Sequence, residues 1–361
     1  MKKLLVIAGG TGGHIFPALV IAETLQKQGV LIEWLGTEVG MERQLIAGKF
    51  PLYFLPIKAL RGKSIRTKLL SPLRLLRAIF LAYRLIKKIN PDVVLGMGGY
   101  ASGPGGIASW ILKKPLIIHE QNAKAGLTNR LLSHFAKKIL QAFPNAFPKN
   151  MTALTVGNPV RPSILAISRP HHYFQTQQKP WHILILGGSQ GAQAMNQLLI
   201  NFMAQYKESE SFLLWHQTGQ RDFETIQKKY KAFTASIYRV EPFIEKIEEA
   251  YAWADIVICR AGALTISELA AAGLPSILIP YPYAADDHQY ANAQFLAQAG
   301  AAILFRESEL SVEKLTLCLK DLLSAPNRLQ VMSEKARICA QQNVVEKIIE
   351  EISRAGKSIC A

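Results

Sequence analysis

Cysteine is scarce in this chain of 361 residues. The four that occur are Cys259, Cys318, Cys339 and Cys360. Their wide spacing excludes a zinc cluster or a disulfide framework and suits a reduced compartment. A long apolar segment is also lacking near the N-terminus, because only five apolar residues lie between Lys3 and Gly9, too few for the core of a signal peptide. We therefore expect a protein that stays in the cytosol.

Acidic residues are missing from one long stretch, because no Asp or Glu occurs between Glu42 and Asp92. Residues 1–160 hold 22 Lys and Arg against 6 Asp and Glu, whereas residues 161–361 hold 20 of each. The whole formal charge of +16 therefore belongs to the first half. This asymmetry predicts an anionic partner for that half.

Within the basic stretch, residues 69–88 predict a helix with more apolar surface than one core-facing stripe needs. Three internal arginines argue against a transmembrane span. Two interpretations stay open: a helix lying among the headgroups of an anionic membrane, or an ordinary surface helix packed on a sheet. Nucleic acid is a weaker third interpretation, because no groove-reading motif accompanies the charge.

Two glycine-rich turns of one type lie far apart in the chain, at 9–13 and 187–191. Each follows an apolar, β-rich run and precedes a helical pattern, which is how α/β proteins place backbone N–H groups against phosphate. A third such turn occupies 96–99. Apolar runs and helical patterns alternate throughout, so the fold class predicted is α/β, with two parallel sheets covered by helices. The predicted strands are 4–8, 31–35, 52–57, 93–95, 116–119, 139–142, 183–186, 212–216, 237–240, 256–259, 276–279 and 302–305.

The first turn departs from a dinucleotide-binding fingerprint. Ile15 stands where the third glycine is needed, and the second predicted strand does not end in an acidic residue. The chain also lacks an Asp-x-Asp pair, which argues against a metal-anchored diphosphate. We therefore expect no cofactor and no fixed metal site, with helix dipoles and basic groups stabilising a leaving diphosphate.

The second half contains a different motif at 260–268. Thr265 and Glu268 have the spacing of a capping box, in which the carboxylate bonds back to the N-cap amide. The functional alternative is a carboxylate at a helix start that accepts hydrogen bonds from two ribose hydroxyls. Further along, Gln289 either bonds a sugar hydroxyl or faces water.

Six ordered blocks together resemble the bacterial N-acetylglucosaminyltransferases that convert lipid I to lipid II in peptidoglycan synthesis. These blocks are 10–18, 96–100, 119–129, 156–161, 187–192 and 260–268. The resemblance implies a GT-B glycosyltransferase with two Rossmann-like domains and a cleft between them. Residues 1–160 would bind acceptor and membrane, residues 161–340 would bind UDP-GlcNAc, and a C-terminal helix over 341–361 could pack back on the first domain.

The resemblance also implies an inverting transfer of GlcNAc from UDP-GlcNAc to the C4 hydroxyl of undecaprenyl-diphospho-MurNAc-pentapeptide, at the cytoplasmic face of the inner membrane. Besides these substrates, the implied partners are the anionic membrane surface and other cell-wall synthesis proteins, but no nucleic acid. The donor positions are Thr11, Gly12, Gly13, Asn122, Arg161, Ser189, Ile244, Ala263, Leu264, Thr265, Ile266, Ser267, Glu268 and Gln289. The acceptor diphosphate positions are Gly98, Gly99 and Tyr100. The membrane patch is Leu75, Arg77, Ile79, Phe80, Tyr83, Arg84 and Lys88, which Trp110, Lys113 and Lys114 could extend.

An inverting displacement needs a base that removes the acceptor proton as the oxygen attacks C1. His14 is the first candidate, because the positive end of a helix favours a neutral imidazole. Its alternative role is to close the glycine turn by hydrogen bonding. Glu120, with His119 as a partner, is the second candidate. A different GT-B glycolipid synthase, a sugar-nucleotide epimerase and a non-catalytic membrane scaffold stay open as other functions.

Overall fold

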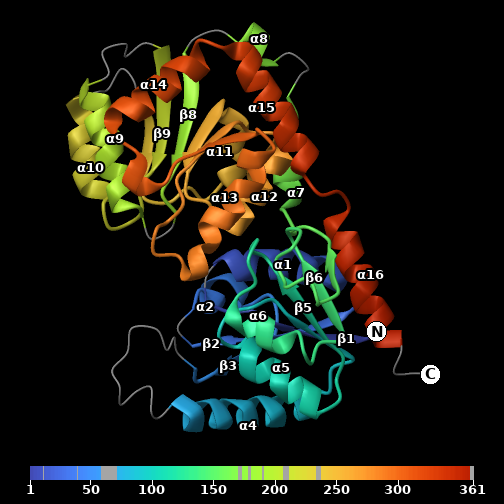
Figure 1. Cartoon of the computed structure of the whole chain (residues 1–361). Helices are drawn as coiled ribbons and strands as arrows, with labels where there is room; N and C mark the ends of the chain where they lie inside the picture. Colours follow the sequence, from blue (N-terminus) through green and yellow to red (C-terminus); the bar gives the residue numbers. More distant parts are fainter. Residues whose placement is uncertain are drawn as a thin grey trace. The chain divides into compact units, whose positions relative to one another are not determined.

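The computed structural model describes residues 1–10, 12–38, 40–57, 71–169, 173–177, 180–188, 191–205, 211–232 and 237–357. The chain forms two compact units (Figure 1). The first comprises Met1–Pro159 and Gln341–Ala361, and the second comprises Val160–Ala340. The chain thus passes from one unit to the other twice, and its last helix belongs to the first unit.

The first unit is built on a parallel sheet with the order β3-β2-β1-β4-β5-β6-β7. Its strands are β1 (Lys3–Ile7), β2 (Leu31–Thr37), β3 (Leu52–Leu55), β4 (Val93–Gly96), β5 (Leu116–Glu120), β6 (Lys138–Gln141) and β7 (Ala153–Thr155). Residues 4–7 of β1 are completely buried, as expected for a parallel strand covered on both faces.

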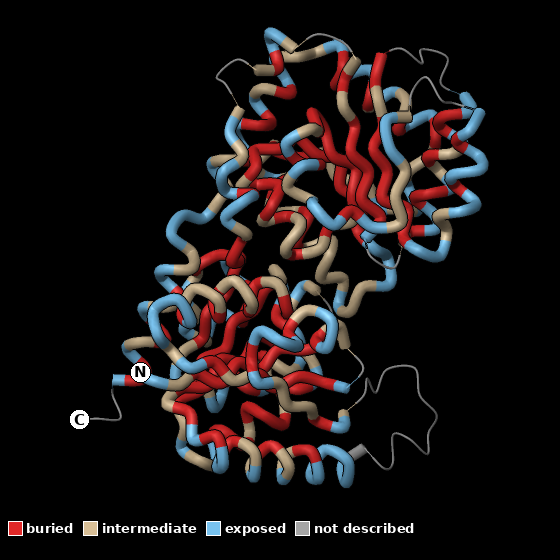
Figure 2. Tube along the Cα trace, turned by 180° about the vertical axis from the view of Figure 1, so that it is seen from behind, coloured by how far each residue is buried: buried red, intermediate tan, exposed pale blue. Residues whose placement is uncertain are grey.

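Helices cover both faces of this sheet (Figures 1 and 2). They are α1 (Gly12–Lys27), α2 (Glu42–Ile46), α4 (Ser71–Ile89), α5 (Ser102–Ile111), α6 (Leu127–Leu132) and α16 (Val344–Lys357). Leu4 and Val6 share one core with α1 and α16. Leu5 and Ile7, which point the other way, share a second core with α4 and α5. The strictly alternating directions of neighbouring strand residues produce these two layers.

The second unit repeats this plan with the order β10-β9-β8-β11-β12-β13, again entirely parallel. Its strands are β8 (Trp181–Leu186), β9 (Phe212–Gln217), β10 (Ile237–Glu241), β11 (Ile256–Cys259), β12 (Ser276–Leu278) and β13 (Ala302–Leu304). Its α-helices are α7 (Pro162–Leu165), α8 (Tyr173–Thr176), α9 (Gln193–Gln205), α10 (Phe223–Tyr230), α11 (Ile247–Trp253), α12 (Ala263–Ala272), α13 (His288–Gln298), α14 (Val312–Leu323) and α15 (Pro326–Cys339).

Several helix ends in the second unit follow from the residues at those positions. Ser311 caps α14, because its Oγ accepts a hydrogen bond from the backbone N–H of Lys314 at 3.3 Å. Pro326 begins α15, where its missing N–H costs nothing. Gly273 ends α12 with φ of 65°, the left-handed conformation that glycine adopts without strain.

Each of the twelve predicted strands corresponds to a strand of the structure, with ends that differ by up to two residues. The additional strand is β7, Ala153–Thr155, which the sequence analysis missed. It has three residues, none of them buried, so it lacks the apolar run on which the prediction depends. Among the described helices, none is long and apolar enough to span a bilayer.

Candidate functional site

In each unit the glycine-rich turn lies at the point where the strand order reverses. The turn at 9–13 follows β1, which pairs with β2 on one side and β4 on the other. The turn at 187–191 follows β8, which lies between β9 and β11 in the same way. Parallel α/β sheets bind ligands at the carboxyl ends of strands at such points. Each unit therefore has its own candidate binding edge.

In the first unit, the turns after β1 and β4 pack directly on each other. Gly99 has φ of 80°, and a Cβ there would lie 2.3 Å from the carbonyl oxygen of Gly9. Gly98 has φ of 88°, and a Cβ there would lie 3.0 Å from Cε1 of His14. The left-handed backbone favours glycine at both positions, and at Gly99 the close approach also leaves no room for a Cβ. The predicted acceptor position Tyr100 follows and is 47% exposed.

A buried carboxylate that the sequence analysis missed holds the first turn. Glu42 Oε1 accepts hydrogen bonds from the backbone N–H of Gly10 at 3.1 Å and from the N–H and Oγ1 of Thr37, each at 2.8 Å. It thus ties the turn to the end of β2. A Cβ at Gly40 would lie 1.6 Å from Glu42 Oε2, so glycine makes room for this side chain. The sequence signal for this role is weak: Gly36 and Gly40 flank the end of β2, and the acid Glu42 follows.

The first candidate base, His14, is in the first turn of α1, where Gly12 and Gly13 precede it. Its Nδ1 lies 3.0 Å from Oε1 of Gln121. Gln121 follows β5 and is 1% exposed. The structure therefore brings together residues from two of the six blocks, 107 positions apart in the chain.

The second candidate base, Glu120, is a buried carboxylate whose two oxygens are occupied. Oε1 accepts hydrogen bonds from the backbone N–H and Nδ2 of Asn122, at 2.9 and 3.0 Å. Oε2 accepts from Gly126 N–H at 3.1 Å and from Asn129 Nδ2 at 2.8 Å. His119, expected as its partner, instead bonds Gly157 O and Gln121 through its ring nitrogens. Glu120 therefore shapes the loop between β5 and α6.

In the second unit, the turn after β8 also depends on left-handed glycines. Gly188 and Gly191 have φ of 85° and 79°, and a Cβ at Gly191 would lie 2.8 Å from the carbonyl oxygen of Thr218. The N–H of Gly191 donates to Gly188 O at 3.1 Å, which closes the turn. Two predicted donor positions, Thr11 and Ser189, lie outside the described residues.

The predicted capping box at the start of α12 is wrong. The helix begins at Ala263 with Gly262 as its N-cap, so Thr265 is already inside the helix. The predicted donor positions from Ala263 to Glu268 form the first turns of α12. Their leading N–H groups lie at the positive end of the helix, which favours an anion.

Glu268 is buried within the second unit and has specific partners there. Its Oε2 accepts a hydrogen bond from the Tyr251 hydroxyl at 3.0 Å, and its Oε1 lies 3.6 Å from Nη2 of Arg161. Arg161 Nη1 also lies 3.8 Å from Glu248 Oε2. Burial raises the pKa of the Glu268 carboxyl, while Arg161 and Tyr251 act in the opposite direction. Arg161 thus favours the charged form of a carboxylate that burial disfavours.

The remaining donor positions of the second unit are also held by hydrogen bonds. The backbone N–H of Ile244 donates to Gln217 Oε1 at 3.0 Å. Gln289 Oε1 accepts from the backbone N–H of Tyr281 at 2.9 Å, so its side chain organises the segment after β12. Arg260, which the sequence analysis did not single out as a site residue, donates to the carbonyl of Ile279 at 3.0 Å and fixes the same segment.

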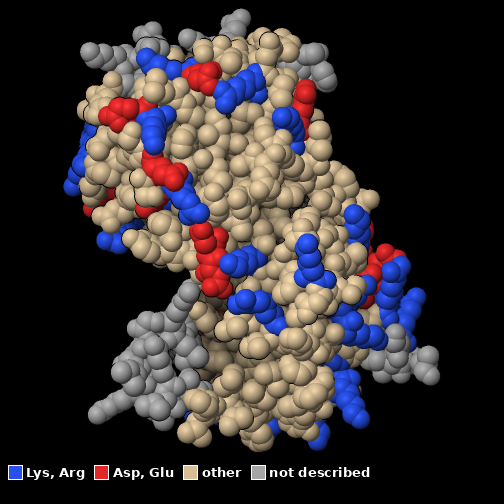
Figure 3. Space-filling view, viewed as in Figure 1, with Lys and Arg blue, Asp and Glu red and all other residues tan. Residues whose placement is uncertain are grey.

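The predicted membrane patch on α4 has one buried and one exposed side. Ala78, Ala82, Ile86 and Ile89 face the core, as an ordinary surface helix requires. Large apolar residues nevertheless face outward: Leu73, Leu75, Leu76 and Phe80 are 41–66% exposed. Ile79 and Tyr83 are half-buried, while Arg77, Arg84 and Lys88 are exposed. On the face that Figure 3 shows, few acidic side chains lie over the first unit apart from those along α16.

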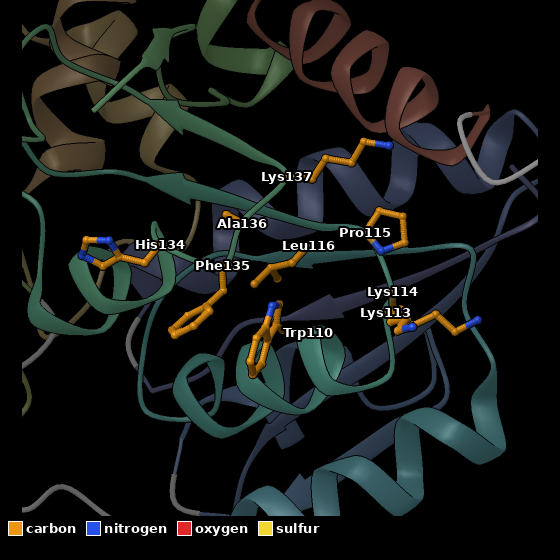
Figure 4. Close-up of a pocket in the computed structure, with 9 residues that line it drawn as sticks. All are labelled: Trp110, Lys113, Lys114, Pro115, Leu116, His134, Phe135, Ala136 and Lys137. Atoms are coloured by element: carbon orange, nitrogen blue, oxygen red, sulfur yellow. The ribbon is translucent and has the colours of Figure 1, made fainter. Parts of the chain in front are cut away.

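A cavity of about 410 Å³ lies between the end of α5 and the segment before β6 (Figure 4). Trp110 and Phe135 stand side by side in it, with ring centroids 4.9 Å apart. Lys113, Lys114 and Lys137 also line it. Trp110 and Phe135 are 52% and 40% exposed. Exposed aromatic side chains and lysines thus occur together here, as apolar and basic side chains do on α4.

Two parallel sheets, each with a glycine-rich turn suited to phosphate, fit an enzyme that acts on a nucleotide sugar. Comparison with known families agrees: residues 4–141 match the glycosyltransferase family 28 N-terminal domain, and residues 182–357 match the glycosyltransferase family 28 C-terminal domain. The chain belongs to glycosyltransferase family 28, and it is a glycosyltransferase.

Individual relatives show which glycosyltransferases this chain is similar to in sequence and structure. A protein of Coxiella burnetii named UDP-N-acetylglucosamine--N-acetylmuramyl-(pentapeptide) pyrophosphoryl-undecaprenol N-acetylglucosamine transferase is 49% identical over 98% of this chain and 99% of its own length. A protein of the same name from Marinobacter nauticus is 45% identical over 96% of both chains. The crystal structure of Acinetobacter baumannii MurG, at 40% identity, superposes with a TM-score of 0.83 over 98% of this chain and all of that one.

These comparisons confirm the resemblance inferred from the six blocks, and they confirm the GT-B fold class. The UDP-GlcNAc 2-epimerase of Neisseria meningitidis superposes with a TM-score of 0.65 at 14% identity, covering 98% of this chain and all of that one. Identity that low shows a shared fold but not a shared function, which depends on the residues of the site.

Proposed function

We propose that this enzyme transfers GlcNAc from UDP-GlcNAc to the C4 hydroxyl of undecaprenyl-diphospho-MurNAc-pentapeptide, giving lipid II and UDP with inversion at C1. The observation that carries this proposal is the 49% identity over 98% of the chain to a transferase named for these substrates. The second support is chemical: each sheet ends in glycine turns suited to phosphate, and donor and acceptor each contain a diphosphate.

The second unit holds the donor in this proposal. The diphosphate of UDP lies at the turn 187–191 and at the N-terminus of α12, where backbone N–H groups and the helix dipole favour negative charge. Glu268 accepts hydrogen bonds from ribose hydroxyls, and Arg161 offsets charge on the leaving UDP. The remaining donor positions named by the resemblance supply contacts to uracil and sugar. A fixed metal ion is not needed for this stabilisation.

His14 is the general base in this proposal. It removes the C4 proton while the C4 oxygen attacks C1, and the C1–phosphate bond breaks with its electrons leaving on UDP. Three observations favour His14 over Glu120. Its ring follows the glycine turn, it is half-buried and so accessible to a substrate, and the hydrogen bond at Nδ1 leaves Nε2 for the proton. Glu120, in contrast, already accepts four hydrogen bonds within its own loop.

The first unit holds the acceptor diphosphate at Gly98, Gly99 and Tyr100 in this proposal, and α4 rests on the cytoplasmic face of the inner membrane. The support is the row of outward apolar side chains on α4, Leu73, Leu76 and Phe80 among them, flanked by exposed basic residues. An ordinary surface helix exposes its polar face, so this pattern favours a peripheral membrane site. Other cell-wall synthesis proteins are further candidate partners of this surface.

The experiment that tests the function measures UDP release from UDP-GlcNAc with and without a short-chain lipid I analogue. We expect release only with the acceptor, and we expect His14→Ala to lower kcat by about 10²–10⁴-fold, the usual contribution of a general base. Glu120→Gln serves as the comparison, and its thermal unfolding is measured with its activity, because the new amide NH₂ would face two of the N–H donors that the carboxylate now accepts. A larger kcat loss for Glu120→Gln than for His14→Ala, with thermal unfolding unchanged, would transfer the base role to Glu120.

A further inference from the structure

A chain of hydrogen bonds runs from His14 into the interior of the first unit. His14 Nδ1 lies 3.0 Å from Gln121 Oε1, Gln121 Nε2 lies 3.1 Å from His119 Nδ1, and His119 Nε2 lies 2.9 Å from the carbonyl oxygen of Gly157. Gln121 is 1% exposed and His119 is completely buried. Because these groups are buried, the hydrogen-bonded partners themselves determine which atoms carry the protons.

The carbonyl of Gly157, at the inner end of this series of hydrogen bonds, determines the direction of each of them. The carbonyl of Gly157 only accepts, so Nε2 of His119 carries a hydrogen. Complete burial lowers the pKa of His119 to about 4, so the ring is neutral at pH 7 and its Nδ1 is an acceptor. The amide NH₂ of Gln121 must therefore face His119, and its Oε1 must face His14. An amide oxygen only accepts, so His14 donates from Nδ1–H.

We propose that Gln121 and His119 are positioning residues that hold neutral His14 as its Nδ1–H tautomer, with Nε2 unprotonated and ready to receive the acceptor proton. This inference rests on the proposed role of His14 as the base. When Nε2 takes the proton from the C4 hydroxyl, the ring becomes an imidazolium whose Nδ1–H stays bonded to Gln121 Oε1. The amide dipole then stabilises the positive charge that develops in the transition state.

The surrounding residues hold this chain in one geometry. Asn158 Nδ2 donates to the backbone carbonyl of Gln121 at 3.0 Å, and Asn129 Nδ2 donates to the backbone carbonyl of His119 at 3.1 Å. Gly157 has φ of 95°, and a Cβ there would lie 2.6 Å from Cβ of Gln341. Its carbonyl oxygen is therefore held by a backbone that only glycine adopts easily at such close packing.

The test is ¹⁵N NMR of the full-length enzyme labelled at histidine, which distinguishes the two neutral tautomers by the shifts of the ring nitrogens. The His14 signals are assigned by their absence in His14→Gln. We expect Nδ1–H for His14 in the unmodified enzyme and a shift toward the other tautomer in Gln121→Leu. The matched control is Gln141→Leu, because Gln141 is also a buried glutamine at a strand end but bonds Thr155. A neutral His14 protonated at Nε2 in the unmodified enzyme would overturn the proposal without any variant.

Activity gives the second readout. We expect Gln121→Leu to lower kcat by about 10- to 100-fold, part of the contribution of a general base, with the KM for UDP-GlcNAc largely unchanged. Gln141→Leu is expected to keep its kcat. If His14→Ala retains full kcat while the NMR shows the Nδ1–H tautomer, then the base assignment fails and the tautomer assignment stands. If Gln121→Leu leaves the His14 tautomer unchanged, Gln121 is not a positioning residue.

Discussion

Replacing Gly99 by alanine should separate the two glycine turns of the first unit. A Cβ at Gly99 would lie 2.3 Å from the carbonyl oxygen of Gly9, whereas ordinary contact begins at 3.4 Å. The Cβ is fixed rigidly to the backbone of residue 99 and the oxygen belongs to the backbone of Gly9, so one turn must move by about 1 Å. A displacement of that size in a site that positions reacting groups costs about 100-fold in rate. Because alanine is strained at a φ of 80°, the substitution should also lower the free energy of unfolding by about 1–2 kcal/mol.

The matched control for this substitution is Gly48→Ala. Gly48 has φ of 83°, close to that of Gly99, but no atom lies within 4 Å of the place that a Cβ would take, and it belongs to neither binding edge. It should lose about 1–2 kcal/mol of stability in urea unfolding and keep its rate of acceptor-dependent UDP release. If Gly99→Ala matched Gly48→Ala in both assays, the close packing of the two turns would not matter for catalysis.

Three further predictions concern pH, the donor site and the membrane. Burial lowers the pKa of His119 to about 4 and that of His216 to about 3, so below pH 6.5 the unfolded chain binds more protons. The free energy of unfolding should therefore fall by about 2 kcal/mol per histidine between pH 6.5 and pH 5, and pH-independent unfolding would refute this. Tyr251→Phe removes a hydrogen bond that holds Glu268. If Glu268 binds the donor, this variant should lose about 1 kcal/mol of UDP-GlcNAc binding free energy, measured by calorimetry. Unchanged binding would count against a contact between Glu268 and the donor. Leu76→Gln on α4 should weaken sedimentation with anionic vesicles without changing thermal unfolding, and unchanged sedimentation would count against a membrane role.

The strands and the glycine turns could be predicted from the sequence because they depend on local patterns. Buried parallel strands are short apolar runs, and the turns that follow them use glycine for left-handed backbone. The strand β7 escaped because Ala153–Thr155 is neither buried nor long. The capping-box alternative for Thr265 and Glu268 was wrong because Gly262, a residue type about as common at N-caps as threonine, precedes the helix and starts it two residues before Thr265.

The contacts around the sites could not be predicted, since they join residues far apart in the chain. Glu42 is an ordinary acid in the sequence, and only the fold shows that it binds the N–H of Gly10. Gln121 is next to the candidate base Glu120, but only the sheet order brings it to His14. Sequence patterns place residues on edges of a sheet, whereas hydrogen-bond partners depend on tertiary packing.

The structure of the product identifies the reaction. The purified enzyme would be incubated with UDP-GlcNAc and a short-chain lipid I analogue, and the product would be examined by mass spectrometry and NMR. We predict one added GlcNAc, β-linked to the C4 oxygen of MurNAc, with one UDP released for each disaccharide. Conversion of UDP-GlcNAc to its 2-epimer, or UDP release that does not depend on the acceptor, would contradict this prediction.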